Sequence, residues 1–143
     1  MNTFTRFRLV IPRTIYEALL AHALAEVPAE CCGLLAGHIS ADGTVGDVTH
    51  HYPLVNELKS PTEFLSDPYS MLRADKAIRA EGTDVLAVYH SHPTSDPVPS
   101  QKDRERNYSP RVMNLIIGTK ATPEVRAWWL TETDYREAEW EVK

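Results

Sequence analysis

Apolar residues recur at two spacings along the chain, and these spacings predict strands alternating with helices. Residues 7–11 and 31–39 are short, nearly continuous apolar runs, which are typical of strands. Residues 15–27 and 69–82 carry apolar side chains three and four positions apart, as one face of a helix does. The first half of the chain therefore predicts strands separated by helices.

Turn and cap residues mark where these elements begin and end. Pro12 precedes the first helix, which we expect to end near Pro28. Asp67 or Ser66, followed by a proline, predicts the start of the second helix, and Gly82 predicts its end.

A hairpin is predicted between the two helices. Asp42-Gly43 is a turn signal that separates residues 31–39 from another apolar run at 45–55, so these runs are expected to pair antiparallel. Residues 56–68 follow without regular periodicity and predict an irregular segment.

The second half of the chain predicts further strands. Residues 84–89 and 111–119 are continuous apolar runs, as expected of buried central strands, whereas 124–131 and 135–142 alternate more. Strands separated by helices favour a layered α/β fold, and the pattern leaves open which strands pair in parallel.

Two pairs of identical neighbours fall on predicted strands, where adjacent side chains point to opposite faces. We expect one of Trp128 and Trp129 to be buried and the other to turn outward. The same alternation prevents His50 and His51 from joining one site, so a metal role for either carries little weight.

Composition narrows the function classes. A chain of 143 residues with 43% hydrophobic content predicts one globular domain covering residues 1–143. The formal net charge of -5, with scattered Lys and Arg, argues against nucleic acid as a main partner.

The cellular setting follows from two further features. The N-terminal stretch has only a short apolar run before Pro12, which predicts neither a signal peptide nor a membrane span. Cys31 and Cys32 are adjacent, which makes an ordinary disulfide between them sterically awkward. We therefore expect a cytoplasmic protein with reduced cysteines, in which Cys32 is a small core residue.

The candidate chemistry lies directly after residues 84–89. His90 and His92 are spaced by one residue at a strand end, so their imidazoles leave on the same side and can converge on one ion. Asp103 can supply a third ligand, which leaves a tetrahedral zinc with one open position for a water. An open position indicates catalysis.

Simpler interpretations of the same residues exist. A histidine near a strand is usually packed or solvated, although the HxH spacing with a later aspartate favours a metal. Ser100 fits the N-cap of a short helix with Asp103 in its first turn, an arrangement compatible with a metal site. Glu30, just before a buried strand, could equally be an ordinary surface carboxylate.

Taken together, these residues resemble a known family. Glu30 precedes CCGLLAG, HSHP occupies residues 90–93, seven residues separate His92 from Ser100, and two separate Ser100 from Asp103. In order, spacing and flanking residues the chain resembles the JAMM (MPN-plus) zinc metalloproteases.

The resemblance implies a fold and a set of roles. The fold is a mixed β-sheet packed between helices, like that of cytidine deaminases, whose own HxE and PCxxC signature is absent here. One Zn2+ per chain would be held by His90, His92 and Asp103. Glu30 would handle the proton of the attacking water, and Ser100 would stabilise the oxyanion of the tetrahedral intermediate.

The resemblance also implies a substrate class. Family members hydrolyse peptide or isopeptide bonds after the C-terminal glycine of ubiquitin-like proteins, and this chain resembles the compact bacterial kind that acts on sulfur-carrier proteins ending in Gly-Gly. An extended tail could add as a strand beside the irregular segment, with Asn56, Ser60 and Phe64 as groove residues.

Two other functions remain open at this level. A zinc-binding scaffold that recognises a ubiquitin-like partner without turnover would share the ligands, and intact Glu30 and Ser100 argue against it. A hydrolase of small amides or peptides would share the chemistry. The sequence leaves the oligomeric state open.

Overall fold

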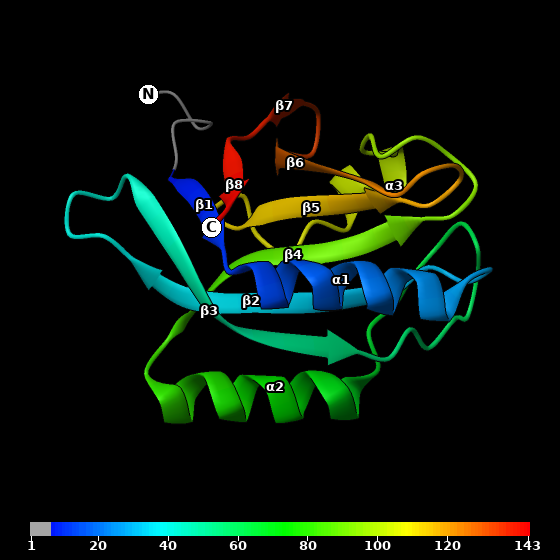
Figure 1. Ribbon diagram of the computed structural model, residues 1–143. Helices are drawn as coiled ribbons and strands as arrows, with labels where there is room; N and C mark the ends of the chain where they lie inside the picture. Colours follow the sequence, from blue (N-terminus) through cyan, green and yellow to red (C-terminus); the bar gives the residue numbers. More distant parts are fainter. Residues whose placement is uncertain (1–6) are drawn as a thin grey trace.

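The computed structural model describes residues 7–143, and their strands form one mixed sheet of eight with helices on both faces (Figure 1). The first six residues lie outside the described residues. They belong to the N-terminal stretch for which neither a signal peptide nor a membrane span is predicted. The helices are α1 (Arg13–Glu26), α2 (Pro68–Glu81) and α3 (Gln101–Glu105). The strands are β1 (Arg8–Ile11), β2 (Cys32–Ile39), β3 (Val45–Leu54), β4 (Asp84–His92), β5 (Met113–Gly118), β6 (Glu124–Leu130), β7 (Tyr135–Glu137) and β8 (Trp140–Val142).

The strand order is β7-β6-β5-β4-β2-β3-β1-β8, which puts the histidine-bearing strand near the middle. β4 pairs antiparallel with β2 and parallel with β5, so both of its edges are hydrogen-bonded. A strand held on both sides is a rigid support for side chains at its end.

The two long helices cover opposite faces of the sheet. Leu19 and Ala23 of α1 pack with Leu35, Tyr89 and the α1-facing residues of β5 and β6 in the larger core cluster. Ala74 and Ile78 of α2 pack over the other face. A sheet buried on both faces explains why its central strands are continuously apolar.

The predicted hairpin and helix ends are confirmed. β2 and β3 pair antiparallel around Gly43, whose φ of +78° suits glycine in the tight turn. Asp67 caps α2 by accepting a hydrogen bond from the Ser70 N–H, and Gly82 ends it in the left-handed region.

Two predictions about the C-terminal region are wrong. Residues 135–142 form two short strands at opposite ends of the strand order: β7 pairs with β6, and β8 pairs parallel with β1. Only two residues separate β7 from β8, so the sheet must curl to bring its two edge strands close together. Trp128 and Trp129 are both buried, because the loop at 93–99 covers the face opposite α1.

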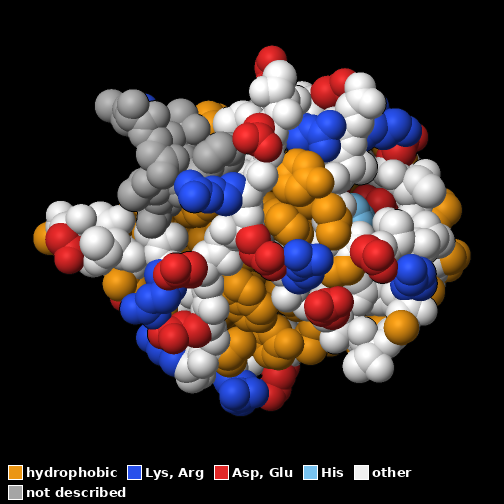
Figure 2. Space-filling view, turned by 90° about the horizontal axis from the view of Figure 1, so that it is seen from above, with side chains coloured by type: hydrophobic (Ala, Val, Ile, Leu, Met, Phe, Trp, Pro, Cys, Tyr) orange, Lys and Arg blue, Asp and Glu red, His pale blue; other side chains and the backbone are white. Residues whose placement is uncertain are grey.

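Among residues 7–143, no helix has the length and apolar character needed to cross a membrane. Figure 2 shows one face of the molecule, where Lys and Arg side chains are interspersed with Asp and Glu around a central hydrophobic group.

Candidate metal centre

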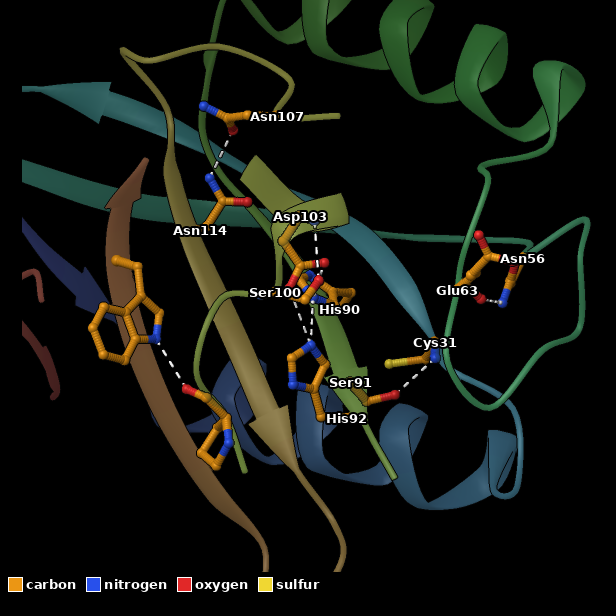
Figure 3. Close-up of polar contacts among 12 residues, drawn as sticks. Cys31, Asn56, Glu63, His90, Ser91, His92, Ser100, Asp103, Asn107 and Asn114 are labelled. Atoms are coloured by element: carbon orange, nitrogen blue, oxygen red, sulfur yellow. Dashed lines mark hydrogen bonds and ion pairs between the residues drawn. The ribbon is translucent and has the colours of Figure 1, made fainter. Parts of the chain in front are cut away.

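The end of β4 brings two imidazoles to the α2 side of the sheet. His90 and His92 are both buried, and their Nε2 atoms lie 3.1 Å apart. Ser91, between them, points to the other face and accepts a hydrogen bond from the Cys31 N–H. The alternation expected of a strand thus separates the two histidines from their neighbour (Figure 3).

Asp103 completes a group that can hold a metal. One carboxylate oxygen lies 3.2 Å from His90 Nε2, and the other lies 3.2 Å from His92 Nε2. Ligands about 2.0–2.1 Å from a tetrahedral zinc lie about 3.3–3.4 Å from each other, so the observed separations fit that ion. Among the described residues this is the one such group of three.

The loop after β4 fixes the orientation of His92. Its Nδ1 lies 2.8 Å from the backbone carbonyl oxygen of Asp96, which can only accept, so Nδ1 carries the proton and Nε2 carries the lone pair. This is the tautomer that a metal ligand requires. The Nδ1 of His90 is buried and has no hydrogen-bond partner among the described residues.

A capping box on α3 orients Asp103. The Ser100 backbone N–H donates to the Asp103 carboxylate over 2.9 Å, and the Asp103 N–H donates to the Ser100 hydroxyl over 3.1 Å. The predicted N-cap and the predicted ligand are therefore parts of one short helix, which links the serine to the metal group.

Charge interactions within the group are strong. Burial opposes the charge on Asp103, but the imidazoles of His90 and His92 and the Ser100 N–H hold its pKa well below the usual range. Burial also opposes the charge on His92, but Asp103 outweighs it and raises the His92 pKa. Asp103 and His92 therefore stabilise each other's charged forms.

Glu30 lies beside this group, directly before β2. Cys32 pairs with His90 across the sheet, so continuing the register brings Glu30 opposite His92. Glu30 is only 4% exposed, and burial raises its pKa to about 8, while His92 lowers it and Asp103 raises it. A carboxyl group with this pKa can take up and deliver a proton near neutral pH.

The site opens into a cavity of about 640 Å³. The irregular segment forms one wall, the region of α3 forms another, and β2 and β4 form an apolar floor. His90 and Asp103 line this cavity, so the metal group borders a space large enough for an extended peptide.

The three predicted groove residues lie in different places. Phe64 lines the cavity, and its ring stacks on His90 with centroids 4.7 Å apart. Asn56 is buried behind the wall, with its side chain bonded to backbone groups. Ser60 is partly buried and is not among the residues that line the cavity, and its carbonyl oxygen accepts a hydrogen bond from the Glu30 N–H.

Sequence reasoning missed two features of the cavity. Lys102 Nζ lies 2.6 Å from Glu63 Oε1, an ion pair that ties α3 to the irregular segment. Asn114 projects into the cavity from β5 and donates to Asn107. The signal for Asn114 was available, because it is the one polar residue inside an otherwise apolar run at 112–117.

The remaining candidates lie away from the metal group. His51 Nε2 and His22 Nδ1 each lie 2.7 Å from the Tyr89 hydroxyl, on the α1 side of the sheet. Cys31 and Cys32 are free and buried, and burial raises the pKa of each thiol to about 12. Such thiols are core residues without nucleophilic character.

Comparison with known proteins agrees with this geometry. Residues 12–131 match the family described as prokaryotic homologs of the JAB domain. A probable TtuB-protein conjugate cleaving protease of Thermus thermophilus is 40% identical over 126 residues, which cover 87% of this chain and 77% of the relative. A desampylase of Haloferax volcanii is 35% identical over 138 residues, covering 93% and 95%.

A solved structure has the same fold. The solution structure of a protein from Desulfitobacterium hafniense superposes with a TM-score of 0.83 at 32% identity, covering 94% of this chain and 92% of that one. The JAMM resemblance and the predicted mixed sheet between helices are both confirmed. The chain belongs to the family of prokaryotic homologues of the JAB domain.

Proposed function

We propose that the protein is a zinc-dependent metallopeptidase that hydrolyses the peptide or isopeptide bond after the C-terminal glycine of a ubiquitin-like or sulfur-carrier protein. The observation that carries this proposal is the convergence of His90, His92 and Asp103 on one point at the wall of a cavity, with Glu30 beside them. One zinc ion per chain fits this donor set.

The residues around the site can divide the chemistry among them. Zinc, when bound, would make a coordinated water acidic and polarise the scissile carbonyl. The Glu30 carboxylate accepts a proton from the attacking water and returns it to the leaving amine nitrogen. The Ser100 hydroxyl accepts the Asp103 N–H with a lone pair, so its own O–H can donate to the developing oxyanion.

The substrate class is supported by the relatives and by the cavity. The Thermus relative is named as a probable protease that cleaves TtuB–protein conjugates, and we expect the substrate of this chain to enter the cavity as an extended tail. Phe64, Leu58 and Leu65 on the wall offer apolar contacts to such a tail. In a carrier tail that ends in Gly-Gly, the two glycines have no side chains, so the tail backbone could pass close to His90 in the cavity.

The test pairs metal content with cleavage. Zinc is measured in the wild-type protein and in Glu30→Gln, and each is incubated with a sulfur-carrier protein bearing a short extension after its Gly-Gly. Mass spectrometry then reads the new C-terminus. The proposal expects one zinc in both proteins and cleavage after the second glycine by the wild type alone.

Two alternative outcomes are informative. Zinc in both proteins without cleavage of any carrier would favour a binding scaffold, and cleavage of short amides but not of carriers would favour a small-substrate hydrolase. Absence of zinc after reconstitution would overturn the metal assignment itself.

A further inference from the structure

The backbone of Glu30 is held differently from that of its neighbours. Cys31 is fixed across the sheet, because its N–H donates to the Ser91 hydroxyl and its carbonyl accepts from the Ser91 N–H. Glu30 lies one residue beyond this pairing. Its N–H donates to the Ser60 carbonyl over 2.8 Å, and its carbonyl accepts from Asn56 Nδ2 over 3.0 Å. Both peptide groups of Glu30 are therefore held by the irregular segment.

Asn56 is the centre of that segment. Besides Glu30, its Nδ2 donates to the Glu63 carbonyl over 3.1 Å, and its Oδ1 accepts from the N–H groups of Leu58 at 3.1 Å and Leu65 at 3.0 Å. Four hydrogen bonds use both donors and both principal acceptor positions of the amide. A side chain that is 7% exposed and fully bonded has no capacity left for a substrate.

The segment also contacts α3, the helix that carries Asp103. The Glu63 carboxylate bonds Lys102, next to Asp103, and lies 3.5 Å from Arg106. Figure 3 shows Asn56 and Glu63 side by side on the segment, with Asp103 on the neighbouring helix. One short loop thus supports the glutamate on one side of the site and touches the helix of the aspartate on the other.

We propose that Asn56 is a positioning residue for the general base Glu30, which it holds by its hydrogen bond to the Glu30 carbonyl and by closing the segment that carries the Ser60 carbonyl. This inference rests on the proposed function of Glu30. The role differs from substrate binding, because Asn56 lies behind the cavity wall, and it differs from metal binding, because Asn56 contacts none of the three ligands.

The first test separates turnover from binding. Asn56→Ala should lower kcat by about ten- to a hundredfold, since a displacement on the order of 1 Å costs that much, and should change KM by less than about threefold. Zinc content should stay at the wild-type value. Ser70→Ala is the matched control. The Ser70 hydroxyl accepts a hydrogen bond from the backbone N–H of Val55, the residue before Asn56, but forms no hydrogen bond with Glu30. The kcat of this variant should match the wild type.

A double variant asks whether Asn56 acts through Glu30. In a Glu30→Gln background, adding Asn56→Ala should cause no further loss of kcat, because the group being positioned is already gone. The same fold loss in both backgrounds would overturn the proposal, as would an unchanged kcat in Asn56→Ala.

A second measurement needs no substrate. Amide hydrogen exchange at Glu30 should accelerate at least about tenfold in Asn56→Ala and remain unchanged in Ser70→Ala. Asn56→Asp, which keeps the acceptor oxygen and replaces the donating NH2 group by an oxygen, gives the same readout if the alanine variant unfolds. Unchanged exchange in a folded Asn56 variant refutes the positioning role, whereas an inactive wild type with the expected exchange pattern counts only against the peptidase function.

Discussion

His92 donates its Nδ1–H to the backbone carbonyl of Asp96, and this single bond decides which nitrogen of His92 faces the metal group. The carbonyl belongs to the loop at 93–99. That loop is anchored one residue later, where the Trp128 indole N–H donates to the Pro97 carbonyl over 3.0 Å. The orientation of a ligand on β4 thus depends on a tryptophan of β6, from which β5 separates it in the sheet.

Trp128 should influence zinc affinity through this series of contacts. Trp128→Phe keeps a large apolar ring but loses the N–H, so the loop and the Asp96 carbonyl should shift. Zinc affinity should fall by about tenfold, the low end of the effect of outer contacts on metal ligands. Competition with a coloured chelator measures it. Trp129→Phe is the control, because Trp129 packs against Phe7 on the α1 side, and its zinc affinity should equal that of the wild type.

Ser100→Ala should abolish most turnover while sparing the metal. The variant loses an oxyanion donor, which costs about a hundred- to a thousandfold in kcat. Asp103 keeps its orientation, since it is the backbone N–H of residue 100 that bonds its carboxylate. Stoichiometric zinc with a hundredfold lower kcat is expected. Loss of zinc in parallel with activity would show that the hydroxyl supports the ligand and not the oxyanion.

Phe64→Ala should raise KM. The Phe64 ring lines the cavity on one side and stacks on His90 on the other. Its removal would take away an aromatic surface that the C-terminal tail of the proposed substrate would contact. A lost contact of about 1.5 kcal/mol corresponds to about a tenfold rise in KM. Steady-state kinetics with an extended carrier measures this, with Phe64→Tyr as the conservative comparison. A fall in kcat at constant KM would contradict a binding role.

His51 should make the fold sensitive to acid. Burial lowers its pKa from 6.5 to about 4, so between these values the unfolded chain binds a proton that the folded chain does not. Stability is therefore complete above about pH 6.5 and is lost as the pH falls toward 4. The shift corresponds to at most about 3 kcal/mol, and partial exposure reduces this to about 1–2 kcal/mol.

The measurement is urea unfolding of metal-free protein between pH 7 and pH 4.5. His51→Gln should show a flatter dependence on pH than the wild type. His38→Gln replaces an exposed histidine of the neighbouring strand and should follow the wild-type curve. Equal slopes for all three proteins would assign the acid sensitivity to other groups.

Much of this architecture could be predicted because local signals were strong. The caps of α2 and the Gly43 turn are set by residues within a few positions of each other. The HxH spacing at the end of β4 brings two imidazoles to one face whatever the rest of the chain does. These features depend on short stretches of sequence, which pattern analysis reads directly.

Other features depend on contacts between distant segments. Trp128 is buried because a loop about thirty positions earlier in the chain covers it. Residues 135–142 form two separate strands, β7 and β8, because the sheet curls. The bonds of Asn56 to Glu30 and of Glu63 to Lys102 join residues 26 and 39 positions apart. No periodicity carries such information, because it arises from the tertiary arrangement.

The two short strands that end the sheet have a consequence for self-association. An enzyme that accepts extended tails risks having such a tail, or a strand of another copy, extend its own sheet at an open edge. Here β7 and β8 present only three residues each, about 10 Å of backbone, and they are joined by two residues of the same chain. Edges of that length are poor templates for pairing with another chain, so the two terminal strands limit self-association at both ends of the strand order.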